Sequence, residues 1–75
     1  MVAKANNYRS LVKEIRKQLG LSQEDLAREL GVSFATVNRW ENGQVRPSKL
    51  AKAQLNAFCT RMAAKGKLRL SGALA

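Results

Sequence analysis

Seven residues at fixed spacing within the 18-residue stretch 23–40 constrain the fold of this chain more than any other feature. Five of them are apolar and fall where two short, consecutive helices must pack on each other: Leu26, Leu30, Val32, Val37 and Trp40. Ala27 is small where the second helix passes closely, and Gly31 stands at the turn between the helices. Two short helices joined by a tight, glycine-containing turn form a helix-turn-helix. The spacing therefore predicts this motif over residues 23–40.

Capping signals set the boundaries of these two helices. Ser22 and Asp25 have the spacing of a capping box, so the first helix begins directly after Ser22. Ser33 can cap the second helix, which runs to about Asn42, and Gly43 can adopt the left-handed conformation that ends a helix.

Two further helices flank the motif. The first covers about residues 8–19 and carries an apolar stripe made of Leu11, Val12, Ile15 and Leu19. The other follows a cap at Ser48 and carries apolar residues at helical spacing: Leu50, Ala51, Leu55, Phe58, Cys59 and Met62. The chain is therefore predicted to be all-α, a compact bundle of four helices, or five if a further helix forms.

The helical pattern fades after about residue 64. We expect residues 1–64 to form the domain and residues 65–75 to form a basic C-terminal tail. Residues 67–71 alternate between polar and apolar, which fits either a short strand or a flexible segment.

The charge of the chain indicates a polyanionic partner. Fourteen lysines and arginines against five acidic residues give a net charge of +9 on 75 residues. All the acids precede residue 44, so residues 44–75 carry seven bases and no acid. Nucleic acid is the polyanion that this balance favours. An anionic membrane is the other, but residues 65–75 have too little apolar surface for anchoring, so no membrane partner is expected.

The residue inventory excludes most catalytic and metal chemistry. The chain has no histidine, and Cys59 is its one cysteine, so an intrachain disulfide and a thiolate metal cluster are excluded. Cys59 has apolar neighbours and is expected to be buried, which leaves no activated nucleophile. We therefore expect no enzymatic activity, no metal and no cofactor.

The same inventory bears on where the protein is found. No apolar run approaches the roughly 18 residues of a membrane span, and the first nine residues are too polar for a signal peptide. The sequence therefore predicts a cytoplasmic protein, associated with the nucleoid where its partner is chromosomal DNA.

The stretch LGLSQEDLA, residues 19–27, and the close WENG, residues 40–43, resemble the helix-turn-helix domains of Cro and the lambda repressor, also called the xenobiotic-response-element family. The similarity extends from residue 8 to about residue 62. It implies sequence-specific binding of double-stranded DNA by a transcriptional regulator of bacterial or phage type. The family commonly binds palindromic sites as a dimer, so a homodimer is one state that the resemblance implies.

The recognition helix of such a domain corresponds to about residues 33–42. With Val37 and Trp40 in the core, a rotation of about 100° per residue turns a second set of side chains outward. That set is Ala35, Asn38, Arg39 and Asn42, with Phe34 on the flank.

The outward side chains near the start of this helix are candidates for reading bases, because that part enters the major groove. Arg39 can form a bidentate pair with guanine and Asn38 with adenine. Phe34 and Ala35 can contact thymine methyl groups. The resemblance assigns base reading to the positions of Phe34, Ala35 and Arg39, while packing against the preceding helix is the other interpretation of Phe34.

Six residues are candidates for contacts with the DNA backbone. Gln23 lies in the first turn of its helix, where free N–H groups attract phosphate, and the matching glutamine contacts the backbone in similar domains. The others offer hydroxyl, amide or guanidinium groups on or just after the recognition helix: Ser33, Thr36, Asn42, Gln44 and Arg46. Such contacts fix the register on DNA without reading its sequence.

The resemblance also implies an ion pair within the domain. Arg16 and Glu41 match positions that pair in similar domains, between the first helix and the end of the recognition helix. Arg16 is then part of the scaffold.

Two other functions fit the sequence. One is an antitoxin-like module that binds DNA and also binds a protein partner through its C-terminal tail, with contacts from Leu68, Leu70 and Leu74. The other is the DNA-targeting N-terminal domain of a larger DNA-modifying protein.

Overall fold

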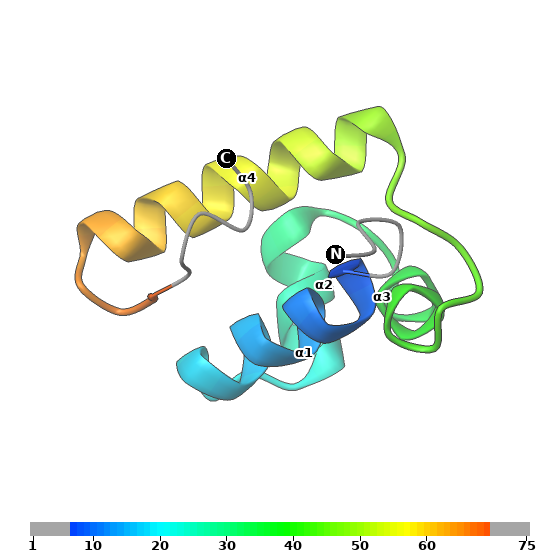
Figure 1. Cartoon of the computed structure of the whole chain (residues 1–75), viewed down its shortest axis with the longest axis horizontal. Helices are drawn as coiled ribbons and strands as arrows, with labels where there is room; N and C mark the ends of the chain where they lie inside the picture. Colours follow the sequence, from blue (N-terminus) through cyan, green and yellow to red (C-terminus); the bar gives the residue numbers. More distant parts are fainter. Residues whose placement is uncertain (1–6, 70–75) are drawn as a thin grey trace.

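Four α-helices make up most of the chain in the computed structural model, which describes residues 7–69 (Figure 1). The helices are α1 (Asn7–Leu19), α2 (Gln23–Leu30), α3 (Phe34–Glu41) and α4 (Lys49–Ala64). No strand and no fifth helix occurs within residues 7–69. The predicted all-α bundle is confirmed, with four helices in this part of the chain.

Serine caps begin three of the four helices, as the sequence predicts. The Ser22 hydroxyl accepts a hydrogen bond from the Asp25 backbone N–H at 2.9 Å, and the Asp25 carboxylate accepts one from the Ser22 N–H at 3.1 Å. The backbone N–H of Ser22 is the main cause that holds the pKa of Asp25 below its usual value, and the Ser22 side chain is the second. The hydroxyls of Ser33 and Ser48 cap α3 and α4 by accepting from the backbone N–H groups of Thr36 and Ala51. Gly31 ends α2 in the left-handed conformation, with φ of +74°, which favours glycine because it has no Cβ.

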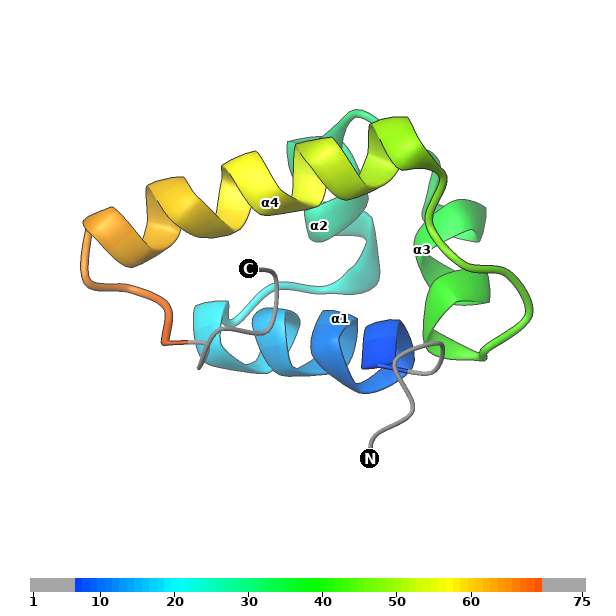
Figure 2. The same ribbon diagram turned by 45° about the horizontal axis from the view of Figure 1, so that its top comes forward.

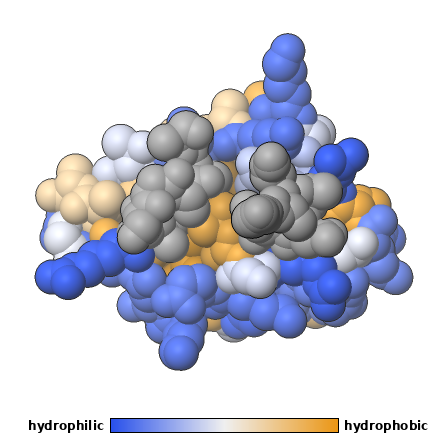
Figure 3. All heavy atoms as spheres, viewed as in Figure 1, coloured by the Kyte–Doolittle hydropathy of each residue, from blue (hydrophilic) through white to orange (hydrophobic). Residues whose placement is uncertain are grey.

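The helices enclose one apolar core. Figures 1 and 2 show α4 running along the length of the molecule over α2, with α1 on the other side and α3 at one end. The largest fully buried side chains are Trp40, Ile15, Leu26, Leu55, Val12 and Val37. In Figure 3 hydrophilic side chains make up most of the edge of one face, and apolar side chains are visible near its middle.

Leu50 does not belong to this core, although it is one of the apolar residues at helical spacing in α4. It is 71% exposed in the first turn of α4. Ala51, Leu55 and Cys59 form the buried stripe of that helix. Leu50 lies five residues before Leu55, a step that turns it about 140° away from the stripe.

Residues 65–69, the described part of the predicted C-terminal tail, return to α1. Gly66 reverses the chain after α4 with φ of +72°, and Leu68 then enters the core at 4% exposure. The Gln18 side chain donates to the Arg69 carbonyl at 2.9 Å and accepts from the Arg69 N–H at 2.8 Å. Residues 65–69 are therefore packed against the domain and form no strand.

This finding also affects the predicted contact with a protein partner. Leu68 is buried within its own chain and does not face outward. Leu70 and Leu74, the other two residues of that prediction, lie outside the described residues.

Cys59 is buried in α4, and burial raises the pKa of its thiol to about 11. Within residues 7–69, no three histidine, cysteine, aspartate or glutamate side chains are grouped closely enough to hold a metal ion. No helix in that range has the length and apolar character to cross a bilayer.

Two leucines of α4 provide a matched test of this packing. We expect Leu55→Ala to lower the free energy of unfolding by about 2–5 kcal/mol, because it removes a fully buried side chain and leaves a cavity. Leu50→Ala should change it by less than about 0.5 kcal/mol, because that side chain is already exposed. Urea denaturation of both variants checks this, and similar losses for the two would contradict the packing described for α4.

Candidate nucleic-acid interface

The helix α3 lies at one end of the molecule and packs against both α1 and α2 (Figure 2). Its inner face buries Val37, Trp40 and Glu41. Side chains of the opposite face are left on the surface at this end. The end formed by α3 and the N-terminus of α2 is the candidate interface.

The four predicted base-reading residues lie on this outer face but differ in accessibility. Phe34 is 53% exposed at the first position of α3, which is unusual for so large an apolar side chain. Ala35 and Arg39 are also exposed. Arg39 has no carboxylate partner among the described residues, so its guanidinium is available to a ligand. Asn38 is half-buried, because its side chain is engaged within the protein.

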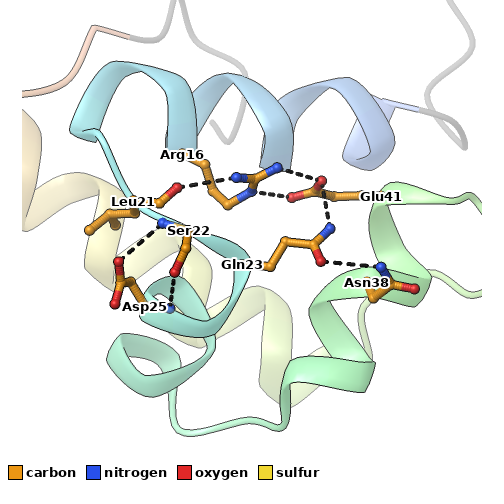
Figure 4. A network of polar contacts seen from close by, with 7 residues as sticks. All are labelled: Arg16, Leu21, Ser22, Gln23, Asp25, Asn38 and Glu41. Carbon is orange, nitrogen blue, oxygen red and sulfur yellow. Dashed lines mark hydrogen bonds and ion pairs between the residues drawn. The ribbon is translucent and has the colours of Figure 1, made fainter.

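A buried ion pair joins α1 to the end of α3. Arg16 Nε donates to Glu41 Oε2 at 2.6 Å, and Arg16 Nη2 donates to Glu41 Oε1 at 2.9 Å (Figure 4). A third bond from Arg16 reaches the Leu21 carbonyl at 3.1 Å. The Glu41 side chain is 3% exposed and that of Arg16 25%. The structure thus brings together the two residues for which the resemblance implies an ion pair.

Three amide side chains, one from α2 and two from the C-terminal half of α3 and its end, extend this pair. Gln23 Nε2 donates to Glu41 Oε1 at 3.0 Å, and Asn38 Nδ2 donates to Gln23 Oε1 at 3.1 Å (Figure 4). Asn42 Nδ2 in turn donates to Asn38 Oδ1 at 3.0 Å. We refer to Arg16, Glu41, Gln23, Asn38 and Asn42 as the amide–carboxylate network.

This network was not anticipated from the sequence, where Gln23, Asn38 and Asn42 were each assigned to DNA alone. Spacing placed Asn38 and Asn42 on the outward face of the recognition helix, but it could not show which way each amide points. Each donating amide uses one of its N–H groups in the bonds above, so a second N–H of Gln23 and of Asn42 remains for a ligand.

The charges of the ion pair stabilise each other. Burial is the strongest single influence on Glu41 and acts to raise its pKa. Hydrogen bonds from Arg16 and Gln23, with the positive charges of Arg16 and Lys13, outweigh burial and leave the pKa of Glu41 below its usual value. The hydrogen bond to Glu41 raises the pKa of Arg16. Both groups are therefore held in their charged forms.

The predicted backbone-contacting residues beyond Gln23 fall into two groups. Ser33 and Thr36 lie at the start of α3, where the Ser33 hydroxyl accepts from the Thr36 N–H at 3.1 Å and lies 2.9 Å from the Thr36 hydroxyl. Asn42, Gln44 and Arg46 are exposed in the segment that follows α3. The described residues offer Arg46 no carboxylate partner.

A hollow of about 220 Å³ opens beside this second group, and Arg9 of α1 lines it together with Gln44 and Arg46. The Arg9 side chain lies across Gly43, with its Cδ only 2.7 Å from where a Cβ would stand. Gly43 has φ of +75°, a backbone conformation that favours glycine, whereas the flexible Arg9 side chain could move aside for a Cβ. Sequence reasoning did not select Arg9, because nothing in its position on α1 indicates that it meets this loop.

Comparison with known proteins places this geometry in a family. Residues 12–51 match the helix-turn-helix family. The chain is 48% identical over 40 residues to a Methanothermobacter thermautotrophicus protein named an uncharacterized HTH-type transcriptional regulator, a match that covers 53% of this chain and 58% of that protein. It is 49% identical over 37 residues to the uncharacterized HTH-type transcriptional regulator YiaG of Escherichia coli K12, covering 49% of this chain and 38% of YiaG. The match thus spans less than two thirds of either relative, and no solved structure matches significantly.

The ion pair leads to a prediction about stability and its pH dependence. We expect Arg16→Met to lower the free energy of unfolding by about 3 kcal/mol, because it leaves the Glu41 carboxylate buried and unpaired. In the wild type, the stabilisation by Glu41 is complete above pH 4.5, the ordinary pKa of glutamate, and is lost as the pH falls through its lowered folded value. The difference in the free energy of unfolding between the wild type and Arg16→Met should therefore become smaller below pH 4.5.

Arg28→Met is the matched control, since Arg28 forms an exposed pair with Asp25 at 3.4 Å. That variant should lose less than about 1 kcal/mol. Chemical denaturation of the three proteins between pH 3 and pH 7 checks both parts, and a difference that widens on acidification would contradict the role given to Glu41.

Proposed function

The chain belongs to the helix-turn-helix family of the Cro and repressor type, a non-enzymatic DNA-binding family, and from this membership we propose that it is a transcriptional regulator that binds specific sequences of double-stranded DNA. In this proposal α3 lies in the major groove. The observation that carries it is the exposed face of α3, a helix whose inner face is buried in the core. This face presents Phe34, Ala35 and Arg39, and Arg39 has no carboxylate partner among residues 7–69.

The chemistry of that face suits the edges of base pairs. The Arg39 guanidinium can donate two parallel hydrogen bonds to O6 and N7 of guanine. Phe34 and Ala35 offer apolar surface to a thymine methyl group. Asn38 is the fourth proposed base reader, and its tie to Gln23 fixes the direction in which its amide is presented.

Phosphate contacts on either side would hold α3 in the groove. Gln23 lies in the first turn of α2, where backbone N–H groups and the helix dipole favour an anion. Beyond α3, Asn42, Gln44 and Arg46 are the proposed backbone contacts. Ser33 and Thr36 join them, because only one of their two O–H groups can serve the hydrogen bond between them.

Net charge supplies the attraction that does not depend on sequence. When a chain of charge +9 binds DNA, its lysines and arginines displace counterions from the phosphates. The affinity for DNA should therefore fall steeply as the salt concentration rises. In a cell this attraction would keep the protein on chromosomal DNA. A homodimer is proposed as the binding state, since two copies of α3 can read two half-sites about one helical turn apart.

Selection of bound duplexes from a random DNA pool, at about 0.15 M salt to screen weak electrostatic binding, tests the proposal. A palindromic consensus would support a sequence-specific dimer. A single half-site would support specific binding and overturn the dimer. Absence of enrichment would overturn sequence-specific recognition.

Arg39→Ala tests the proposed base reader. We expect the variant to bind the selected site about 1–3 kcal/mol more weakly and to lose preference at one base pair, because a bidentate contact is removed. Repeating the selection with the variant measures both effects. An unchanged consensus would show that Arg39 does not read a base.

Arg46→Gln tests a proposed phosphate contact. This change should weaken binding to all duplexes alike and reduce the slope of log affinity against log salt by about one, because one phosphate contact is lost. Lys65→Gln is the control, because it removes the same charge at the C-terminal end of α4, away from α3. Its slope of log affinity against log salt should stay close to that of the wild type. Fluorescence anisotropy titrations at salt concentrations from about 0.05 to 0.3 M provide the slopes, because electrostatic screening changes strongly over this range. Equal slopes for Arg46→Gln and the control would rule out the contact.

A further inference from the structure

A shallow groove of about 330 Å³ lies between the C-terminal ends of α1 and α4. Its apolar lining includes Leu19 and Leu21 on one side and Met62 on the other. These three residues are only partly buried, although they pack against the core. Apolar surface therefore remains open to solvent inside a concave site, where a partner could cover it.

The rim of this groove is positive. Arg61, Lys65 and Lys67 line one side, and Glu29 is the acid on the other. The Arg61 guanidinium lies 5.5 Å from the centre of the Phe58 ring, which holds it at the groove. None of the three cations forms an ion pair with a carboxylate of the described residues. Within residues 7–69 the positive charge on this rim is thus only partly offset, by Glu29.

The groove is separate from the proposed DNA interface. Figures 1 and 2 show the C-terminal end of α4 at one end of the molecule and α3 at the other. A duplex seated on α3 would not cover the groove. Phosphates alone also lack the apolar groups that would cover Leu19, Leu21 and Met62.

We propose that this groove binds an acidic segment of another protein, which places an apolar side chain on the floor and carboxylates against Arg61, Lys65 and Lys67. A second copy of this chain fits less well, because pairing two such grooves would bring their positive rims together. The chain as a whole carries +9, and residues 44–75 contain no acid. Because the two sites are apart, the protein binds the acidic segment and DNA at the same time.

Three synthetic peptides of equal length test the proposal by NMR titration of the full chain labelled with ¹⁵N. The first alternates leucine with glutamate or aspartate, the second replaces each acid by lysine, and the third replaces each leucine by serine. We expect the first alone to bind, with chemical-shift changes at Leu19, Leu21, Met62 and Lys67 and none on α3. Equal binding of the serine peptide would overturn the proposal, because the apolar floor would then have no role.

A pair of double variants isolates the rim. Lys65→Gln with Lys67→Gln should weaken binding of the first peptide about 2- to 30-fold, the loss expected for two exposed ion pairs. Lys13→Gln with Lys49→Gln removes the same charge elsewhere and should weaken it by no more than about twofold, through loss of long-range attraction alone. Equal losses in the two variants would overturn the role of the rim.

Three further outcomes would also overturn the proposal. They are shift changes confined to α3, binding of none of the peptides, and concentration-dependent shifts at the groove without peptide, which would indicate self-association. Titration of the peptide into the protein–DNA complex completes the test, where unchanged peptide affinity is expected. Loss of peptide binding on addition of DNA would show that the two sites overlap.

Discussion

The carboxylate of Glu41 is the one buried charge among the described residues, and the arrangement of α1, α2 and α3 depends on its partners. Glu41 is the last residue of α3, where the helix dipole disfavours a negative charge. Two bonds from Arg16 and one from Gln23 offset both this effect and the cost of burial. Because those partners come from α1 and α2, the charge is satisfied only when all three helices take their native positions.

This dependence explains how a helix as short as α3 can hold its exposed side chains in a defined orientation. Eight residues form too short a helix to be stable alone, so packing must hold it. Val37 and Trp40 supply that packing on the inner face, and Glu41 anchors the end. From Glu41 the amide–carboxylate network continues through Gln23 to Asn38, so part of the proposed reading face is oriented by the same carboxylate.

Local signals in the sequence predicted the helices well, but contacts between residues far apart in the chain could not be predicted from it. Ser22, Ser33 and Ser48 act within their own helical turns, so their role as caps could be predicted from spacing. The exposure of Leu50 could not be predicted, because it depends on which face of α4 meets α2. The burial of Leu68 and the orientation of the Gln23 amide depend on residues of other helices. The helix-turn-helix over residues 23–40 could be predicted because its two helices are consecutive. The residues that pack them together are therefore close in the sequence.

The bonds between Gln18 and Arg69 join residues 51 positions apart, by far the largest sequence separation of any side-chain contact described above. Contacts between α2 and α3 span only short loops and cost little chain entropy to form. The helix-turn-helix can therefore assemble first, with residues 65–69 docking on α1 as a late step. If unfolding reverses this order, local opening begins at the exposed contact between Gln18 and Arg69. Among the described residues, amide protons should therefore exchange fastest at this contact and slowest around Trp40.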